Sequence, residues 1–242
     1  MATVKALLFD VFGTLVDWYG SIQERAESIA AREGLALDGA RLALLWRQRY
    51  APSMANVTSG KRPWCDLDQL HRESLDHVLT ELAVDLPSPA RAELVAGWHE
   101  LRPWPDVVAN LPRLRAQRIT AALSNGHVRL LVDLKRHAGL DFDTILSAEL
   151  ARSYKPEAVV YQTATRLLGL EPDQVMLVAC HAWDLAGAAH AGLRTAYVAR
   201  PAEWGPGTVA APVSADMHAR DLGDLADQFD ALDRSARSTA SG

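Results

Sequence analysis

The chain has 242 residues, of which 49% are hydrophobic and 23% charged, as in an ordinary globular protein with a sizeable core. A formal net charge of −5 gives no basic footprint for nucleic acid. The first apolar run is too short for a membrane span and lacks a signal-peptide pattern. Cys65 and Cys180 form no disulfide framework or zinc-like spacing. We therefore expect a cytoplasmic protein with neither a nucleic-acid nor a membrane partner.

Short apolar runs alternate with helical patterns along most of the chain. The runs are typical of strands buried on both faces and fall at 6–9, 119–123, 144–146, 175–179 and 195–198. The helical patterns fall at 105–117, 126–138, 157–168 and 184–192, and Pro112 should bend or shorten the first of them. This alternation predicts an α/β, Rossmann-like fold with a mostly parallel sheet and helices on both faces.

The stretch from 17 to 100 interrupts that alternation with helical patterns and no convincing strand. Asp66, followed by Gln69 three residues later, has the spacing of a helix N-terminus, and Ser88 also precedes a helical pattern. We interpret 17–100 as an all-helical cap inserted after the first strand of a discontinuous core, 1–16 and 101–233. The small, polar segment 234–242 is expected to be a flexible tail.

Polar side chains follow several of the predicted strands. Parallel strands bind ligands at their carboxyl ends, so these groups should meet at one edge of the sheet. They are Asp10, Ser124, Asn125, Lys155, His181 and Asp184. Taken singly, each has an ordinary structural explanation: an Asp after a strand is usually a turn or cap residue, and a Lys before Pro is usually solvated. Their joint order on different strand ends favours an active site.

The same residues carry a resemblance to a known family. The segments 10–15 (DVFGTL), 124–126 (SNG) and 155–156 (KP), with Trp183 and Asp184, are similar to the four motifs of the haloacid dehalogenase superfamily. The resemblance covers nearly the whole chain, including the helical insertion. It implies that Asp10 is a carboxylate nucleophile supported by Thr14 and Lys155.

Two reactions are open to such an enzyme, and Phe12 separates them. Phosphatases of this superfamily carry a second Asp two residues after the nucleophile, which protonates the leaving alcohol; Phe12 cannot transfer a proton. They also need magnesium held by oxygen ligands, and the fourth motif supplies only Asp184. Halide leaves without protonation and requires no metal. A magnesium-dependent phosphatase stays the alternative, and an inactive binding module is a third hypothesis.

The resemblance extends to the 2-haloacid dehalogenase branch, type II and L-specific. That branch also places an aromatic residue two positions after the nucleophile, and the segment 45–48 (LWRQ) and the spacing from Lys155 to Tyr161 match it. It implies hydrolysis of haloacetates and L-2-halopropionate to 2-hydroxy acids through an ester on Asp10, with no cofactor and no metal, in a protein that could form a homodimer. The substrate-binding residues would be Phe12, Arg47, Ser124, Asn125, Trp46, Tyr161 and Trp183. Arg47 is favoured over Arg49 as the halide ligand.

The fourth motif departs from that branch. It reads ACHAWD over 179–184, whereas better-known members have a run like SSNAWD, so His181 replaces an amide with a titratable ring. We expect His181 and Asp184 to position or deprotonate the water that hydrolyses the ester. Which of the two does so stays open, as do the preferred halogen, the substrate chain length and the oligomeric state.

Overall fold

The computed structural model describes residues 3–207 and 212–240. Within them, six parallel strands form one sheet in the order β5-β4-β1-β6-β7-β8. The strand bounds are β1 Ala6–Phe9, β4 Ile119–Ser124, β5 Thr144–Ser147, β6 Val175–Ala179, β7 Arg194–Val198 and β8 Met217–Ala219. The predicted α/β fold with a parallel sheet is confirmed, and β8 is a strand that the sequence patterns did not predict.

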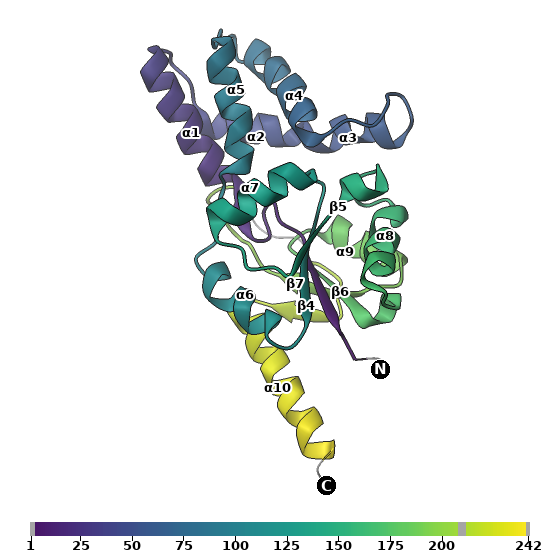
Figure 1. The fold of residues 1–242 in the computed structure, drawn as a ribbon. Coiled ribbons are helices and arrows are strands. Elements are labelled where there is room, and N and C mark those ends of the chain that lie inside the picture. The colour runs from purple at the N-terminus through teal and green to yellow at the C-terminus, as the bar shows by residue number, and fades with distance from the viewer. Residues whose placement is uncertain (1–2, 208–211, 241–242) are drawn as a thin grey trace.

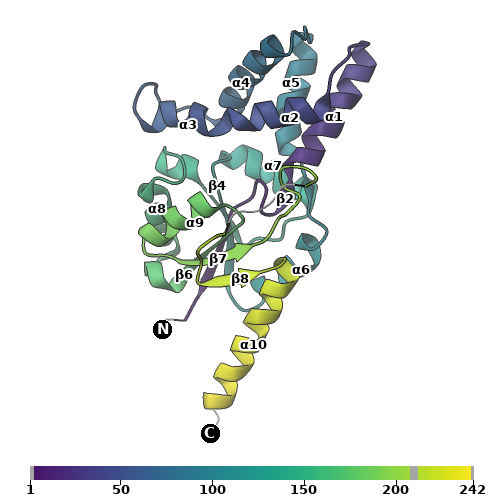
Figure 2. The ribbon, with the colours of Figure 1, turned by 180° about the vertical axis from the view of Figure 1, so that it is seen from behind.

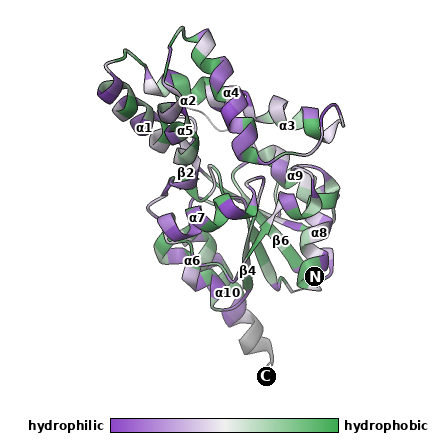
Figure 3. Cartoon of the chain, turned by 45° about the horizontal axis from the view of Figure 1, so that its top comes forward, coloured by the Kyte–Doolittle hydropathy of each residue, from purple (hydrophilic) through white to green (hydrophobic). Residues whose placement is uncertain are grey.

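The sheet is buried on both faces, which explains its continuous apolar runs. In β1, Leu7 and Phe9 point to one face while Ala6 and Leu8 point to the other, as strand geometry requires. Figure 3 shows the same arrangement, with hydrophobic strands such as β4 and β6 between helices of mixed hydropathy. The carboxyl end of central strand β1 therefore lies between neighbours, where Asp10 follows it.

Helices cover both faces of the sheet (Figures 1 and 2). The face of Leu7 and Phe9 packs against α6, α7 and α10, and the face of Leu8 packs against α8 and α9. The bounds are α6 Val107–Arg115, α7 Val128–Ala138, α8 Ala158–Leu168, α9 Ala182–His190 and α10 Leu222–Ala240, with 3₁₀ turns η2 Ala148–Ala151 and η3 Pro172–Gln174. Pro112 lies inside α6, which is a short helix of nine residues.

The helical insertion sits above the carboxyl ends of the strands (Figure 1). The chain leaves the core through β2 Val16–Asp17 and returns through β3 Arg102–Pro103, and these two strands pair as an antiparallel ribbon. Between them lie α1 Trp18–Glu33, α2 Gly39–Gln48, α3 Tyr50–Thr58, α4 Leu67–Glu81, α5 Ser88–Ala96 and the 3₁₀ turn η1 Gly97–His99. We refer to α1–α5 with η1 as the cap.

Two local expectations about helix ends have different outcomes. Asp66 is the N-cap of α4, and its carboxylate accepts a hydrogen bond from the backbone N–H of Gln69 at 3.0 Å, as predicted. Ser88 does not cap α5: it is the first helical residue, after Pro87, and it makes no capping hydrogen bond. The extended conformation that Pro87 adopts ends the loop one residue earlier than expected.

The C-terminal segment continues a helix. Helix α10 extends to Ala240, so residues 234–240 have helical backbone, and their flexibility stays a prediction. Small and polar residues such as Ala and Ser still propagate a helix that is already anchored. Here the anchor is Asp233, which pairs with both guanidinium nitrogens of Arg118 at 2.6 and 2.9 Å. Residues 241–242 lie outside the described residues.

Candidate active site

Strand ends of the sheet bring the predicted polar residues together beneath the cap. Asp10 follows β1, and its backbone N–H donates to the carbonyl of Val178 in β6 at 3.0 Å. Ser124 ends β4, and His181 follows β6. Because these strands are adjacent and parallel, residues far apart in sequence reach one point.

Asp10 is the centre of this cluster and is 4% exposed. Its Oδ1 accepts a hydrogen bond from Lys155 Nζ at 2.9 Å. Its Oδ2 accepts one from the hydroxyl of Thr14 at 2.7 Å and lies 3.0 Å from Nδ1 of His181. The Thr14 hydroxyl in turn accepts from the backbone N–H of Cys180 at 3.0 Å, which fixes the direction of its own proton toward Asp10.

These contacts keep the Asp10 carboxylate ionised. Burial alone would raise its pKa, but the positive charges of Lys155 and His181 and their hydrogen bonds hold the pKa well below its ordinary value. Burial would likewise lower the pKa of Lys155, but Asp10 and Asp184 raise it above its ordinary value. The site therefore contains a carboxylate anion and an ammonium cation at neutral pH.

Asp184 and Tyr161 lie behind Lys155 rather than in the reaction space. The Asp184 carboxylate is fully buried, with one oxygen bound to Lys155 Nζ and the other accepting from the Tyr161 hydroxyl at 2.6 Å. Burial raises the pKa of Asp184, and Lys155 opposes that rise. With each oxygen accepting from a side-chain donor, Asp184 holds Lys155 in place, and its carboxylate has no contact with solvent.

His181 has a second carboxylate partner that sequence reasoning missed. Its Nε2 lies 2.8 Å from Oε1 of Glu203, a buried residue that also accepts from the indole N–H of Trp18 at 3.1 Å. Gly13 makes room for it: at φ +85°, a Cβ there would lie 2.7 Å from the Glu203 carboxyl carbon. Glu203 lies in the loop after β7, whose last residue is Val198. Polar residues that follow parallel strands are candidates for the ligand site, so this position could have been predicted from the sequence.

Charge accumulates around the His181 ring. Burial would lower the pKa of His181, but Cys180, Glu203 and the hydrogen bond to Asp10 hold it well above its ordinary value. Burial also raises the pKa of the Cys180 thiol, so at neutral pH the negative charges beside His181 are the two carboxylates. In the free enzyme His181 is therefore an imidazolium between Asp10 and Glu203.

A cavity of about 350 Å³ opens between cap and core beside this cluster. Lys155 and His181 form its polar floor, and Trp183, 40% exposed, stacks on the His181 ring at a centroid distance of 5.5 Å. The cap supplies the opposite wall. The lining residues are Arg47, Tyr50, Ala51, Met54, Ala55, Thr58, Lys155, Pro156, Glu157, His181, Trp183 and Trp204.

Arg47 is the cation that the cap contributes. Its guanidinium lies over the Tyr50 ring, 4.1 Å from the centroid, and is 5.3 Å from that of Trp18. The residue is 6% exposed, and its Nη1 is a buried donor without a hydrogen-bond partner among the described residues. An unpaired buried donor is costly unless a ligand satisfies it. Arg49, by contrast, points away and pairs with Glu81.

Ser124 and Asn125 lie on the core side of the site. The Ser124 hydroxyl accepts from the backbone N–H of Gly126 at 3.2 Å and is fully buried. The Asn125 carbonyl oxygen accepts from the backbone N–H of Lys155 at 2.7 Å, while its amide nitrogen lies 3.3 Å from the sulfur of Met54 in the cavity wall. The same nitrogen lies 3.5 Å from the carbonyl oxygen of Lys155, so it has two weak partners that a better acceptor could replace.

Two predicted substrate-binding residues are placed elsewhere. Trp46 lies inside the cap, where its indole N–H donates to the carbonyl of His71 at 3.0 Å and its ring meets Trp98 edge-on. Phe12 is 2% exposed and also packs edge-on against Trp98. Neither lines the cavity, since both face the packed centre of the cap–core boundary. Helical spacing gives no indication of which side of α2 faces the ligand.

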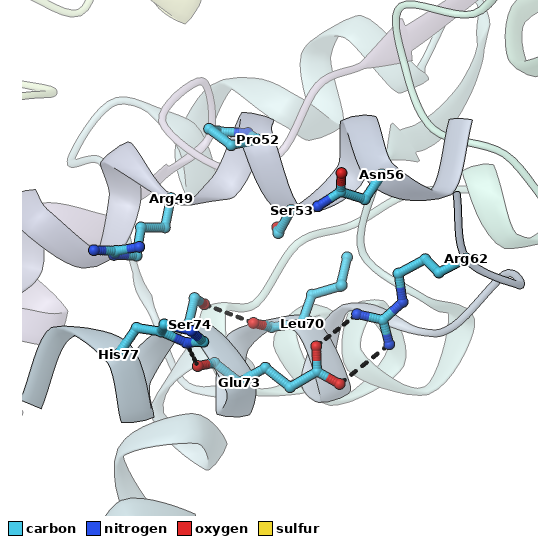
Figure 4. Close-up of a pocket in the computed structure, with 9 residues that line it drawn as sticks. All are labelled: Arg49, Pro52, Ser53, Asn56, Arg62, Leu70, Glu73, Ser74 and His77. Carbon is cyan, nitrogen blue, oxygen red and sulfur yellow. Dashed lines mark hydrogen bonds and ion pairs between the residues drawn. The ribbon is translucent and has the colours of Figure 1, made fainter. Parts of the chain in front are cut away.

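A second hollow on the cap is a different kind of site (Figure 4). It lies between α3 and α4 and is lined by Ser53 and Asn56 on one side and Glu73 and His77 on the other. Its two arginines already have carboxylate partners, because Arg62 pairs with both oxygens of Glu73 and Arg49 pairs with Glu81. It therefore offers no cation comparable with Arg47.

Comparison with known proteins agrees with this geometry. A model of the haloacid dehalogenase-like hydrolases matches residues 4–192. The chain belongs to this hydrolase family. It is similar to (S)-2-haloacid dehalogenase 4A of Burkholderia cepacia, with 31% identity over 82% of this chain and 84% of the relative. (S)-2-haloacid dehalogenase 1 of Pseudomonas sp. (strain CBS-3) is 33% identical over 83% and 86%, respectively.

Solved structures of haloacid dehalogenase-like hydrolases are similar over nearly the whole chain. The L-2-haloacid dehalogenase PA0810 has a TM-score of 0.90 at 45% identity, covering 94% of this chain and 99% of that one. The defluorinating L-2-haloacid dehalogenase Rha0230 also has a TM-score of 0.90, at 44% identity, covering 93% and 94%.

Within this haloacid dehalogenase-like hydrolase, the residues present do not fit a magnesium ion at the active site. A magnesium ion shared by Asp10 and Asp184 would need their oxygens, but the Lys155 ammonium lies between them and bonds to both. Asp10, Cys180 and His181 also offer three ligand atoms close together. A cation there would displace the hydrogen bonds from Thr14 and from the imidazolium of His181. The site is built for an anion.

Proposed function

We propose that this protein is a 2-haloacid dehalogenase, a hydrolase that converts short 2-haloalkanoic acids such as haloacetates and L-2-halopropionate to 2-hydroxy acids. One observation carries the proposal: the ionised Asp10 lies beside the cavity between cap and core, whose cap wall holds Arg47 with its buried Nη1 unpaired. A carboxylate nucleophile facing a buried cation suits a substrate that is itself an anion and releases a halide.

In the first step a carboxylate oxygen of Asp10 attacks C2 of the substrate in line with the carbon–halogen bond. A C–O bond forms, the carbon–halogen bond breaks, and the halide leaves with the bonding electrons. Oδ2 has two hydrogen-bond partners and Oδ1 has one, so Oδ1 keeps more lone-pair density for attack. In-line attack inverts C2, so an L-2-haloacid yields a D-2-hydroxy acid.

Anion binding is divided between core and cap. Arg47 and the amide nitrogen of Asn125 receive the halide, because each is a donor near the cavity with no strong partner. Ser124 and backbone amides after Asp10 hold the substrate carboxylate. Tyr50 and Trp183 exclude water from the carbon centre, which strengthens the electrostatic contacts inside.

In the second step His181, oriented by Glu203, activates the hydrolytic water. Formation of the ester removes the charge of Asp10, so one of the two carboxylates that raise the His181 pKa is lost. His181 then releases its Nδ1 proton to solvent, while Nε2–H still donates to Glu203 and fixes the tautomer. Water attacks the Asp10 carbonyl carbon and passes one proton to Nδ1. The bond between that carbon and the substrate oxygen breaks, and the leaving oxygen takes the proton from Nδ1. The second water proton, left on the Asp10 carboxyl group, passes to Nδ1 and restores the imidazolium and the carboxylate.

The first test distinguishes an aspartyl ester from direct attack by water. A single turnover in ¹⁸O-labelled water leaves the 2-hydroxy acid unlabelled, because its new oxygen comes from Asp10. His181→Ala traps the ester, which mass spectrometry detects as a covalent adduct on the peptide that contains Asp10. Label in the product of the first turnover, or full turnover by His181→Ala without an adduct, would contradict this pathway.

The second test separates halide release from phosphate chemistry. The wild-type protein is assayed with 2-fluoro-, 2-chloro- and 2-bromo-acids and with a generic phosphate ester, each with and without a chelator. We expect halide release that the chelator does not change and no phosphate release. Fluoroacetate belongs in the panel because the similar enzyme Rha0230 is named as defluorinating.

In the described part of the chain, none of the helices has the length and apolar character needed to cross a bilayer. Cytoplasmic location stays a prediction, supported by two free cysteines. Homodimerisation also stays a prediction, which light scattering of the purified protein would test.

A further inference from the structure

A second cluster of ligand-type side chains lies on the cap–core boundary, away from Asp10. Asp68 lies in the first turn of α4, His99 ends η1, and His127 stands at the N-cap of α7, two residues after Asn125. Nε2 of His99 is 3.0 Å from Oδ2 of Asp68, and Nε2 of His127 is 3.7 Å from the same oxygen. One ligand atom from each residue lies within 4.8 Å of the other two.

We propose that Asp68, His99 and His127 form a binding site for a zinc-type divalent metal ion that joins the cap to the core. Zinc binds imidazole nitrogen and carboxylate oxygen at about 2.0–2.2 Å, so a tetrahedral site separates its ligand atoms by roughly 3.3 Å. The distances from Oδ2 of Asp68 to Nε2 of His99 and to Nε2 of His127, 3.0 and 3.7 Å, lie on either side of that value. Two imidazoles favour zinc, cobalt or nickel over magnesium or calcium, which prefer all-oxygen ligands.

The surroundings of His99 match the outer shell of a metal-bound histidine. Its Nδ1 lies 3.0 Å from Oδ2 of Asp133, so Nδ1–H donates to that carboxylate, and its Nε2 lies 3.0–3.1 Å from both oxygens of Asp68. Without an ion, Nε2–H donates to Asp68, and a bound metal would take the place of that proton. Ligating histidines commonly have this carboxylate on their other nitrogen. Arg129 also bonds to Asp133, at 2.8 Å, and this pairing keeps the outer carboxylate from carrying an uncompensated charge.

His127 supplies an independent observation. The residue is 8% exposed, and its Nδ1 has no hydrogen-bond partner among the described residues, while its Nε2 faces Asp68 at a distance longer than a hydrogen bond. A buried imidazole with neither nitrogen well paired is unusual. Metal coordination through Nε2 would give that nitrogen the partner that Asp68 is too distant to supply.

The cluster can be reached from solvent. An open hollow of about 670 Å³ is lined by Asp68, His99 and Asp133, with Arg129 and Arg136 at its edge. Three protein ligands leave the fourth position of a tetrahedral ion to water on this open side. Because Asp68 belongs to the cap and His127 to the core loop that carries Asn125, a bound ion would hold the cap over the active site. The inference does not depend on the reaction at Asp10.

The test uses the full chain, first stripped with a chelator and then titrated with Zn²⁺ or Mg²⁺ by calorimetry and thermal unfolding. We expect one equivalent of Zn²⁺ to bind and raise Tm, with no comparable effect of Mg²⁺. His99→Ala should abolish the Tm shift, and His127→Gln should weaken Zn²⁺ binding by at least about tenfold. His137→Ala, which lines the same hollow without contributing a ligand, is the matched control and should behave as wild type.

Co²⁺ locates the ion. At the proposed site it has only nitrogen and oxygen ligands and gives weak ligand-field bands, which His127→Gln should change. An intense thiolate charge-transfer band that Cys180→Ser removes would instead place the metal at Asp10, Cys180 and His181 and overturn the proposal. Absence of Zn²⁺ binding, or equal Zn²⁺ binding by wild type and His127→Gln, would also overturn the proposal. Both measurements can be made without His99→Ala, so they decide the question if that variant does not fold.

Discussion

Replacing Glu203 by Gln tests whether the buried carboxylate serves the water step. The substitution keeps the size of the side chain and removes the charge 2.8 Å from Nε2 of His181. Two unit charges at that separation interact by about 6 kcal/mol at an effective dielectric constant of about 20, which is an upper limit. A hydrogen bond to a charged partner contributes about 1.5–3 kcal/mol. Because about 1.36 kcal/mol of activation free energy corresponds to a tenfold change in rate, loss of this bond predicts roughly 10- to 150-fold slower ester hydrolysis.

The assay separates the two steps by rapid quench. In Glu203→Gln the first halide should be released at the wild-type rate, as a burst of one per active site, followed by a slow steady state and an ester on Asp10. Loss of the carboxylate also lowers the pKa of His181, so the acidic limb of the steady-state rate should move to lower pH. Glu27→Gln, an exposed carboxylate on α1, is the matched control.

Two results would refute the assignment of Glu203. An unchanged steady-state rate would show that His181 needs no carboxylate on Nε2. A slow first halide without an adduct would place Glu203 in the displacement step instead. Trp18→Phe removes the other hydrogen bond to Glu203 while keeping its charge, so it should retain the wild-type pH profile.

Three further substitutions test other parts of the structure. Arg47→Ala should lower kcat/KM for a 2-haloacid by about 10²-fold, because it removes the proposed halide donor; an equal loss in Arg49→Ala would contradict this role. Lys155→Met should lower the free energy of unfolding, measured in urea, by about 3–5 kcal/mol, because Asp10 and Asp184 are then buried without their cation. The double variant with Asp184→Asn should recover part of this loss, because it removes one of the two buried charges. Asp106→Asn should cost about 1.5–3 kcal/mol at pH 7, because Asp106 pairs with both nitrogens of Arg200. Burial would raise the Asp106 pKa, but Arg200 holds it below its ordinary 3.8, so this stability is fully present above pH 3.8 and is lost as pH falls through the lowered pKa; a difference that does not shrink as pH falls below 3.8 would refute it.

The positions of the buried strands can be predicted from the sequence because they depend on local composition. Strands such as β1 and β6 are buried on both faces and therefore appear as continuous apolar runs. The parallel order then requires Asp10 and His181 to meet at one edge. Strand β8 was missed because it has only three residues and includes the exposed His218.

Side-chain direction is the part that residue spacing does not determine. Trp46 and Arg47 are neighbours on α2, yet one ring packs inside the cap while the other side chain reaches the cavity. Tyr161 was expected at the substrate and instead holds Asp184 by a hydrogen bond. Each outcome depends on how α2 and α8 rotate against their neighbours, which is a tertiary property. Glu203 could have been found, since it follows the end of β7.

The ribbon of β2 and β3 has a consequence for how such enzymes diversify. Val16 pairs with Pro103 and Asp17 with Arg102, so the chain enters and leaves the cap at adjacent points. An insertion with closely spaced ends can be exchanged or shortened to a tight turn while the sheet beneath it keeps its hydrogen bonds. The proposed nucleophile, Asp10, belongs to the sheet, and the proposed halide ligand, Arg47, belongs to the insertion. Under this proposal the chemistry and the leaving-group selectivity are encoded by separately exchangeable segments, and grafting a foreign cap at this ribbon would change the selectivity without altering the sheet.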